Sequence, residues 1–144
     1  MTEPHQLLHP RHWKRPNGYA NGIATEGRLV FLAGQVGWNA EQKFESDDFV
    51  AQTRQALANV AALVAEAGGR PEHVTRLTWY VLDKREYLSR LREVGAAYRG
   101  VMGRHFPAMT LVQVGALVED KAKVEIEATA VIPIEIAARA LTGN

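Results

Sequence analysis

The chain has 144 residues, of which 47% are hydrophobic and 23% are charged, and its formal net charge is +1. At about 150 residues per domain, this length predicts one domain whose core is large enough to need no cross-links. The absence of cysteine excludes disulfide scaffolds, zinc ribbons, iron–sulfur clusters and thiol nucleophiles. The small net charge provides no long-range field to attract nucleic acid, so we expect no nucleic-acid partner.

No segment resembles a membrane span or a secretory signal. The longest stretch without a charged residue runs from His105 to Val118, which is 14 residues interrupted by Pro107, whereas a transmembrane helix needs about 20 apolar residues. The first fifteen residues are basic and lack an apolar segment. We therefore expect a cytoplasmic protein with no membrane partner.

Residues 1–16 show little periodicity and are predicted to form an extended N-terminal arm, followed by a single domain over residues 17–144. The arm carries His5, His9 and His12, but Pro10 breaks any helix that could place these imidazoles around a metal ion. We therefore expect no metal site in the arm.

The domain is predicted to begin with a β-hairpin. A short strand around Tyr19 to Thr25 leads into a turn at Glu26-Gly27. The run from Arg28 to Gln35 is β-branched and aromatic, which indicates a second strand that is buried on both faces.

Two helices and three more strands follow. A helix capped by Ser46 is predicted to run for about 22 residues to Gly68-Gly69, and a second helix carries an apolar stripe from Tyr87 to Met102. Strands are predicted over Val74 to Leu82, Met109 to Gly115 and Lys123 to Ile132. The order ββαβαββ indicates an α+β fold in which two helices cover one face of a sheet and leave the other face in need of a partner.

The residues themselves leave the chemistry open. Glu125 and Glu127 share one face of the last strand with Cα atoms about 6.5–7 Å apart, which suits paired acid and base work or a solvated sheet face equally well. Ser46 and Ser89, the only serines, do not lie in a nucleophile elbow, and the Gly34, Gly37 pair lacks the third glycine of a dinucleotide loop.

In their order and spacing, several short motifs resemble the Rid family of reactive-intermediate deaminases, also called the YjgF family. The resemblance extends from about Gly18 to Val131. The matching motifs are Gly18-Tyr19 with Gly22, Ala33-Gly34-Gln35, Gln52 to Leu57 with Asn59-Val60, Ala67-Gly68, Tyr80 to Asp83, Phe106-Pro107-Ala108 and Val124 to Ala128.

The resemblance implies a chorismate-mutase-like fold and a homotrimer whose sheets form a central barrel. It also implies small-molecule clefts between neighbouring subunits, in which enamines and imines are hydrolysed to 2-keto acids and ammonia. No metal or organic cofactor is implied. A ribonuclease activity, an older attribution within the family, gains no support from the modest charge.

By position, the family's water-positioning glutamate corresponds to Glu125 and its N-terminal tyrosine to Tyr19, and we expect both to be catalytic. The expected substrate-binding residues are Ala33, Gly34, Gln35, Trp38, His105 and Met109.

Met109 departs from the family pattern, because an arginine that holds the substrate carboxylate follows the Pro-Ala pair in the archetype. A thioether cannot supply the bidentate donors of a guanidinium. We therefore predict an imine or enamine hydrolase with altered substrate choice, in which Arg104 or His105 is a candidate replacement for the lost charge. The alternative is a metabolite-binding or chaperone-like trimer without catalytic activity.

Overall fold

The structure, a computed structural model, describes residues 5–135. Four strands form a mixed sheet in the order β3-β6-β4-β5, in which only β4 and β5 are parallel. In chain order the elements are β1 (Gln6–Leu8), β2 (Gly22–Ala24), β3 (Arg28–Val36), α1 (Phe49–Glu66), a 3-10 turn η1 (Pro71–His73), β4 (Val74–Val81), α2 (Lys84–Ser89), α3 (Leu91–Met102), β5 (Ala108–Gln113) and β6 (Val124–Ile132).

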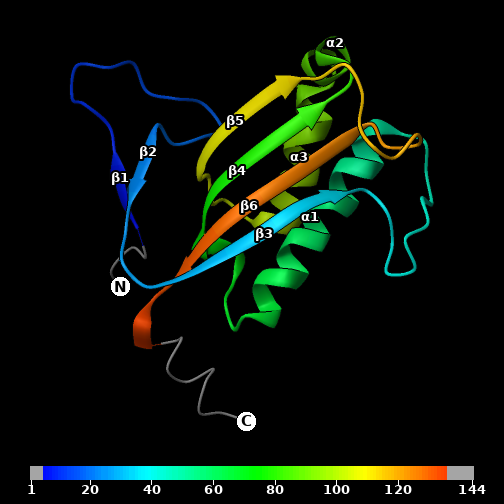
Figure 1. The fold of residues 1–144 in the computed structure, drawn as a ribbon. Coiled ribbons are helices and arrows are strands. Elements are labelled where there is room, and N and C mark those ends of the chain that lie inside the picture. The colour runs from blue at the N-terminus through cyan, green and yellow to red at the C-terminus, as the bar shows by residue number, and fades with distance from the viewer. Residues whose placement is uncertain (1–4, 136–144) are drawn as a thin grey trace.

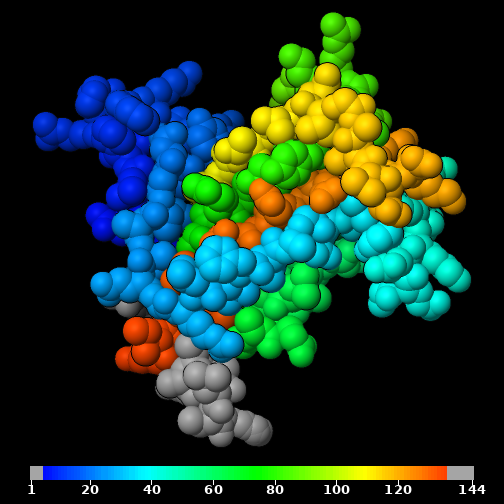
Figure 2. Space-filling model, viewed as in Figure 1, coloured from blue at the N-terminus to red at the C-terminus, as the bar shows by residue number. Residues whose placement is uncertain are grey.

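The helices cover one face of the sheet and leave the other open, as predicted (Figure 1). Leu77, Trp79 and Val81 of β4 point into the core, as do Val124 and Ile126 of β6, and all five are almost fully buried. Figure 2 looks onto the opposite face, where side chains of all four strands reach the surface. The α+β fold is therefore confirmed. No helix within residues 5–135 is long and apolar enough to cross a membrane.

Helix α1 is shorter than predicted because its N-cap lies two residues later and the helix ends before Gly68-Gly69. The Asp48 carboxylate accepts a hydrogen bond from the Ala51 backbone N–H (3.0 Å) and is the N-cap. The Ser46 hydroxyl instead accepts from the N–H of Asp48 (2.9 Å), which orders the approach to the helix. The helix spans 18 residues and ends at Glu66, with Ala67 as its C-cap.

The predicted second helix is two helices, α2 and α3, that meet at Arg90. Asp83 caps α2 by accepting from the N–H groups of Arg85 and Glu86. The backbone of Arg90 leaves helical geometry, while its guanidinium bonds both Asp48 (2.7 Å) and Glu93 (2.6 Å). The side-chain partners of Arg90 thus tie the break between α2 and α3 to the start of α1.

Strand β3 is not buried on both faces as predicted, because the helices cover only one side of the sheet. Val30 and Leu32 pack against the core, whereas Leu29 and Phe31 point to the open face with 60% and 74% of their surfaces exposed. A register shift in the pairing with β6 between Leu32 and Gln35 marks a β-bulge. The open face of β3 is therefore apolar and uncovered within one chain.

The N-terminal residues also differ from the prediction. The hairpin across Glu26-Gly27 is absent from the described chain, because β2 pairs antiparallel with β1 of the arm and not with β3. The arm is not simply extended: after β1 it turns, with the Trp13 N–H donating to Pro10 O (2.9 Å), and returns as β2. Figure 1 shows this two-stranded sheet standing beside the start of β5.

Candidate functional site

Glu125 and Gly34 lie against each other on the open face of the sheet. Glu125 alternates with the buried Val124 and Ile126 of β6, so its side chain points away from the helices. A Cβ atom added to Gly34 would lie 2.0 Å from Glu125 Oε2. The bulge of β3 thus brings backbone that carries no side chain beside the Glu125 carboxylate, and both positions are ones that the family resemblance singled out.

A tyrosine and a second glutamate complete this polar group, which we call the carboxylate face (Gly34, Tyr80, Glu125 and Glu127). The Tyr80 hydroxyl donates to Glu127 Oε1 (2.9 Å), and Tyr80 lies opposite Glu125 in the β4–β6 register. The hydrogen bond to Glu127, followed by partial burial and the two carboxylate charges, raises the pKa of Tyr80. Tyr80 therefore stays a neutral donor beside two acceptors. The sequence alone assigned Tyr80 no role in the site.

The other residues predicted near Gly34 have mainly local contacts. Gln35 Nε2 donates to the carbonyl of Ala33 (3.0 Å) within the bulge. Trp38 lies beyond the end of β3, where its ring packs 5.8 Å from that of Phe44 and its carbonyl accepts from Asn59 Nδ2 (2.9 Å). Asn59 thereby fastens the chain after β3 to helix α1.

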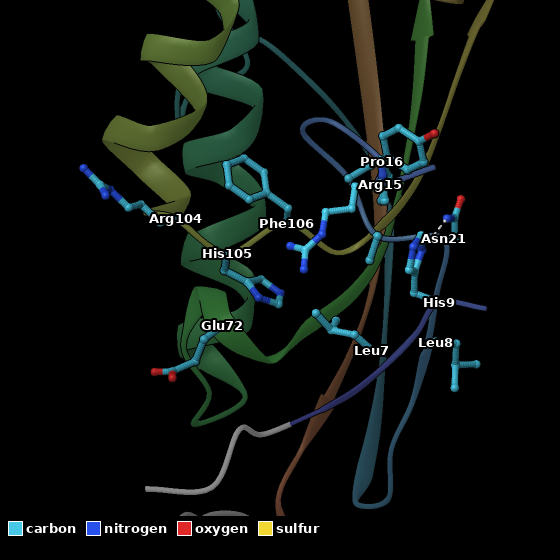
Figure 3. Close-up of a pocket in the computed structure, with 12 residues that line it drawn as sticks. Leu7, Leu8, His9, Arg15, Pro16, Asn21, Glu72, Arg104, His105 and Phe106 are labelled. Carbon is cyan, nitrogen blue, oxygen red and sulfur yellow. Dashed lines mark hydrogen bonds between the residues drawn. The ribbon is translucent and has the colours of Figure 1, made fainter. Parts of the chain in front are cut away.

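Tyr19 and His105 line a different cavity, which we call the arm pocket. It has a volume of about 750 Å³ and lies between the N-terminal arm and the segment before β5 (Figure 3). The arm runs alongside that segment, because the Ala20 N–H donates to the Pro107 carbonyl (3.0 Å) and Ala20 pairs with Ala108. The pocket is lined by Leu7, Leu8, His9, Arg15, Pro16, Tyr19, Ala20, Asn21, Glu72, Arg104, His105 and Phe106.

His105 is held rigidly at the wall of the arm pocket. Its Nε2 lies 2.7 Å from the carbonyl of Val74, and its own carbonyl accepts a hydrogen bond from the buried Tyr98 hydroxyl. The His5 ring packs 5.9 Å from the His105 ring, so the arm covers this histidine. No group of three or more histidine or acidic side chains within residues 5–135 is arranged to hold a metal ion.

Met109 contributes to neither group of residues within one chain. It pairs with Leu77 in the parallel β4–β5 register and packs on the core side of the sheet. It is absent from the lining of the arm pocket, which reaches Phe106.

The carboxylate face and the arm pocket are far apart in one chain. Glu125 lies opposite Tyr80, and Ala108 lies opposite Arg76, four residues back along β4. Ala20 in turn lies beside Ala108, so three strand spacings separate it from β6. Together with the four residues along the strand, these spacings put the Cα atoms of Glu125 and Ala20 roughly 20 Å apart. A small ligand therefore cannot touch both groups of the same chain. The family resemblance placed these residues in clefts between neighbouring subunits, without saying which subunit supplies each residue.

Comparison with known proteins gives consistent matches along the chain. The family model described as Endoribonuclease L-PSP matches residues 13–132. The chain is 34% identical over 116 residues to the 2-iminobutanoate/2-iminopropanoate deaminase of Salmonella typhimurium, which covers 78% of this chain and 86% of the relative.

Solved structures agree with this match. The Rid-family protein YyfB of Yersinia pestis, whose function is described as unknown, superposes with a TM-score of 0.79 at 30% identity over 90% of this chain and 99% of that one. Escherichia coli TdcF with bound serine gives a TM-score of 0.63 at 26% identity over 88% and 98% of the two chains. Because one family model matches residues 13–132 and a deaminase relative is 34% identical over 78% of the chain, the chain belongs to the Rid (YjgF) family.

Proposed function

We propose that the protein hydrolyses a small imine or enamine metabolite to a carbonyl compound and ammonia, in clefts between the subunits of a homotrimer. The exposed Leu29 and Phe31 on the open sheet face support the trimer, because contiguous apolar surface of this kind marks an interface. The separation of Tyr19 from Glu125 supports a cleft between subunits. The arm pocket of one subunit would meet the carboxylate face of its neighbour.

Glu125 is the residue to which we assign the chemistry. Its carboxylate accepts a hydrogen bond from a water molecule and orients the water oxygen towards the imine carbon. Addition of water across the C=N bond gives a carbinolamine, and transfer of a proton to nitrogen lets ammonia leave as the C=O bond forms. The Tyr80 hydroxyl donates its hydrogen bond to Glu127, so it presents its oxygen to the reacting water as an acceptor. Water is the only co-reactant, and the proposal requires no cofactor.

The approach of Gly34 to Glu125 is the observation that carries this proposal. A backbone without a side chain leaves the Glu125 carboxylate open at the bulge, where any Cβ would collide with it. Close approach to a ligand or a functional group is one of the few uses that require glycine in a strand. Two relatives give further support, since one is a deaminase of 2-imino acids and TdcF binds serine, a small amino acid.

Met109 supports a substrate choice different from that of the deaminase relatives. It has no charge for a substrate carboxylate, and loss of a buried contact of this kind costs on the order of 2–5 kcal/mol unless another base replaces it. We therefore assign the protein to imines that are bulkier or more apolar than 2-iminopropanoate.

The test is ammonia release from 2-iminopropanoate and from bulkier 2-imino acids, each generated in place by an amino-acid oxidase. We expect turnover of the bulkier imines and its loss in Glu125→Gln, because the amide cannot act as a base. Met109→Arg serves as the matched variant and is expected to improve turnover of 2-iminopropanoate. Ligand binding without turnover of any imine in either background would refute the hydrolase and favour a metabolite-binding trimer.

A further inference from the structure

We propose that Arg15, from the N-terminal arm, binds the carboxylate of an organic acid that has a bulky apolar body, in the arm pocket. The proposal deepens the proposed function and rests on it for the identity of the reaction, but not for the binding itself. It assigns a positively charged residue to carboxylate binding, a role for which Met109 has no charge.

Arg15 is the arginine that points into the pocket. In Figure 3 its guanidinium extends towards His105 and Phe106, whereas the side chains of Arg104 and Glu72 point outwards from the cavity. Arg15 takes part in none of the ion pairs found within residues 5–135. Its guanidinium presents a planar fork of donors with the geometry that a carboxylate accepts.

The path of the arm brings this cation to the start of β5. Ala20 pairs with Ala108, the residue directly before Met109, and Arg15 precedes Ala20 by five residues. The pairing of β1 with β2 closes the arm over this segment. An arginine carried on the arm is therefore brought near the start of β5, although the Met109 side chain itself packs on the core side of the sheet.

The walls and the size of the pocket indicate the rest of the ligand. Leu7, Leu8, Pro16 and Phe106 supply apolar surface, and Tyr19 supplies a ring with a polar tip. A volume of about 750 Å³ lies within the range of roughly 300–1,000 Å³ that holds ligands of drug size. A three- or four-carbon acid would leave most of this apolar wall uncovered. The ligand class that fits is a carboxylate joined to an aromatic or branched hydrocarbon group.

Equilibrium binding to the full chain tests this assignment without any need for turnover. The probes are 3-phenylpropanoate, its uncharged amide and propanoate, each titrated into the protein and followed by NMR. The variants are Arg15→Met, Arg15→Lys, Arg104→Met and, as a control for loss of charge, Arg11→Met, which lies in the same arm but outside the pocket lining. Thermal unfolding of each variant checks that the fold is unchanged.

We expect 3-phenylpropanoate to bind more tightly than the amide or propanoate. Arg15→Met should weaken its binding by roughly 10- to 150-fold, the range of a charge-assisted hydrogen bond. Binding of the amide should change little. Arg15→Lys should retain part of the affinity, because it keeps the charge and loses the fork. Arg11→Met should bind like the wild type, and Arg104→Met, whose side chain points out of the cavity, should weaken binding less than Arg15→Met does.

Equal binding of the acid and the amide, or loss of binding in Arg104→Met rather than Arg15→Met, would overturn the assignment. Separate results would contradict the proposed hydrolase activity and the proposed role of Arg15. A protein that binds 3-phenylpropanoate through Arg15 but hydrolyses no imine contradicts the hydrolase alone. A protein that hydrolyses 2-imino acids equally well with Arg15→Met contradicts the role of Arg15 alone.

Discussion

The substitution Gly34→Ala tests whether the carboxylate of Glu125 is the working group of the site. The new Cβ would lie 2.0 Å from Glu125 Oε2, whereas ordinary contact begins at 3.4 Å, so the carboxylate has to move by about 1.4 Å. A displacement of about 1 Å in a catalytic group can cost on the order of a hundredfold in rate. We expect the stability cost to be small, because the three nearest atoms, Oε2, Cδ and Cγ of Glu125, all belong to one flexible side chain and none to the backbone. We expect imine hydrolysis to fall about a hundredfold in kcat, with the thermal unfolding temperature nearly unchanged.

Gly37→Ala is the matched control, because the same added methyl group meets backbone. Its Cβ would lie 2.4 Å from Gln52 O and 2.6 Å from Gln52 Cα, inside helix α1. Overpacking of this kind costs about 1–3 kcal/mol, which lowers the unfolding temperature by several degrees in a domain of this size. If Gly34→Ala keeps full activity, Glu125 does not have the role proposed here. If it destabilises the fold as much as Gly37→Ala does, the collision is not confined to the Glu125 carboxylate.

Three further predictions concern stability, pH and the assembly. Gln52 donates to the carbonyls of Ser46 and Lys121 and accepts from the N–H of Lys123, so Gln52→Leu removes three part-buried hydrogen bonds and should lower the free energy of unfolding by roughly 3 kcal/mol. Burial lowers the pKa of His73 below its ordinary value of about 6.5. The unfolded chain therefore takes up a proton first as the pH falls, and stability should decline below about pH 6.5, less steeply in His73→Asn. Mixed trimers of Arg15→Met and Glu125→Gln subunits should recover activity at about a quarter of their sites, because random mixing pairs an intact arm pocket with an intact carboxylate face at that frequency.

Each of these predictions has a contrary result. Denaturant unfolding of Gln52→Leu with an unchanged midpoint would mean that water replaces the three lost bonds. An identical pH slope in wild type and His73→Asn would place the proton uptake on other groups. If the mixed trimers are no more active than trimers of either variant alone, Arg15 of one subunit and Glu125 of its neighbour do not act together in one cleft.

Regular alternation made the centre of the fold predictable. From Leu77 to Val81 in β4 and from Val124 to Ala130 in β6 every second residue is buried, since one face meets the helices and the other is open, and a period of two can be read without knowing the neighbours. For the same reason Glu125 and Glu127 could be placed on one face from the sequence. The motif around Gly34 was found by resemblance, and its physical meaning, the absence of space for a Cβ beside Glu125, required the structure.

The errors occurred where contacts distant in sequence decide the conformation. Two acceptors, Ser46 and Asp48, compete to begin α1, and the bonds of Arg90 to Asp48 and Glu93 favour the later start and the break between α2 and α3. Strand β1 has three residues, too few to show periodicity. Its partner in β2 lies about sixteen residues away. Arg15 was therefore treated as part of a featureless arm.

The arm also explains how loss of charge at Met109 can be compatible with recognition of an acid. A two-stranded sheet of three residues per strand is marginal by itself, and the hydrogen bond between His5 Nδ1 and Thr25 Oγ1 (3.0 Å) adds one more contact between its strands. A carboxylate bound to Arg15 would stabilise the arm in this position, because a ligand stabilises the state that binds it. Leu7, Leu8 and Pro16 belong to the same arm and line the same pocket. A cation carried on the arm therefore couples recognition of the acid to the position of the apolar wall that would contact the rest of the ligand.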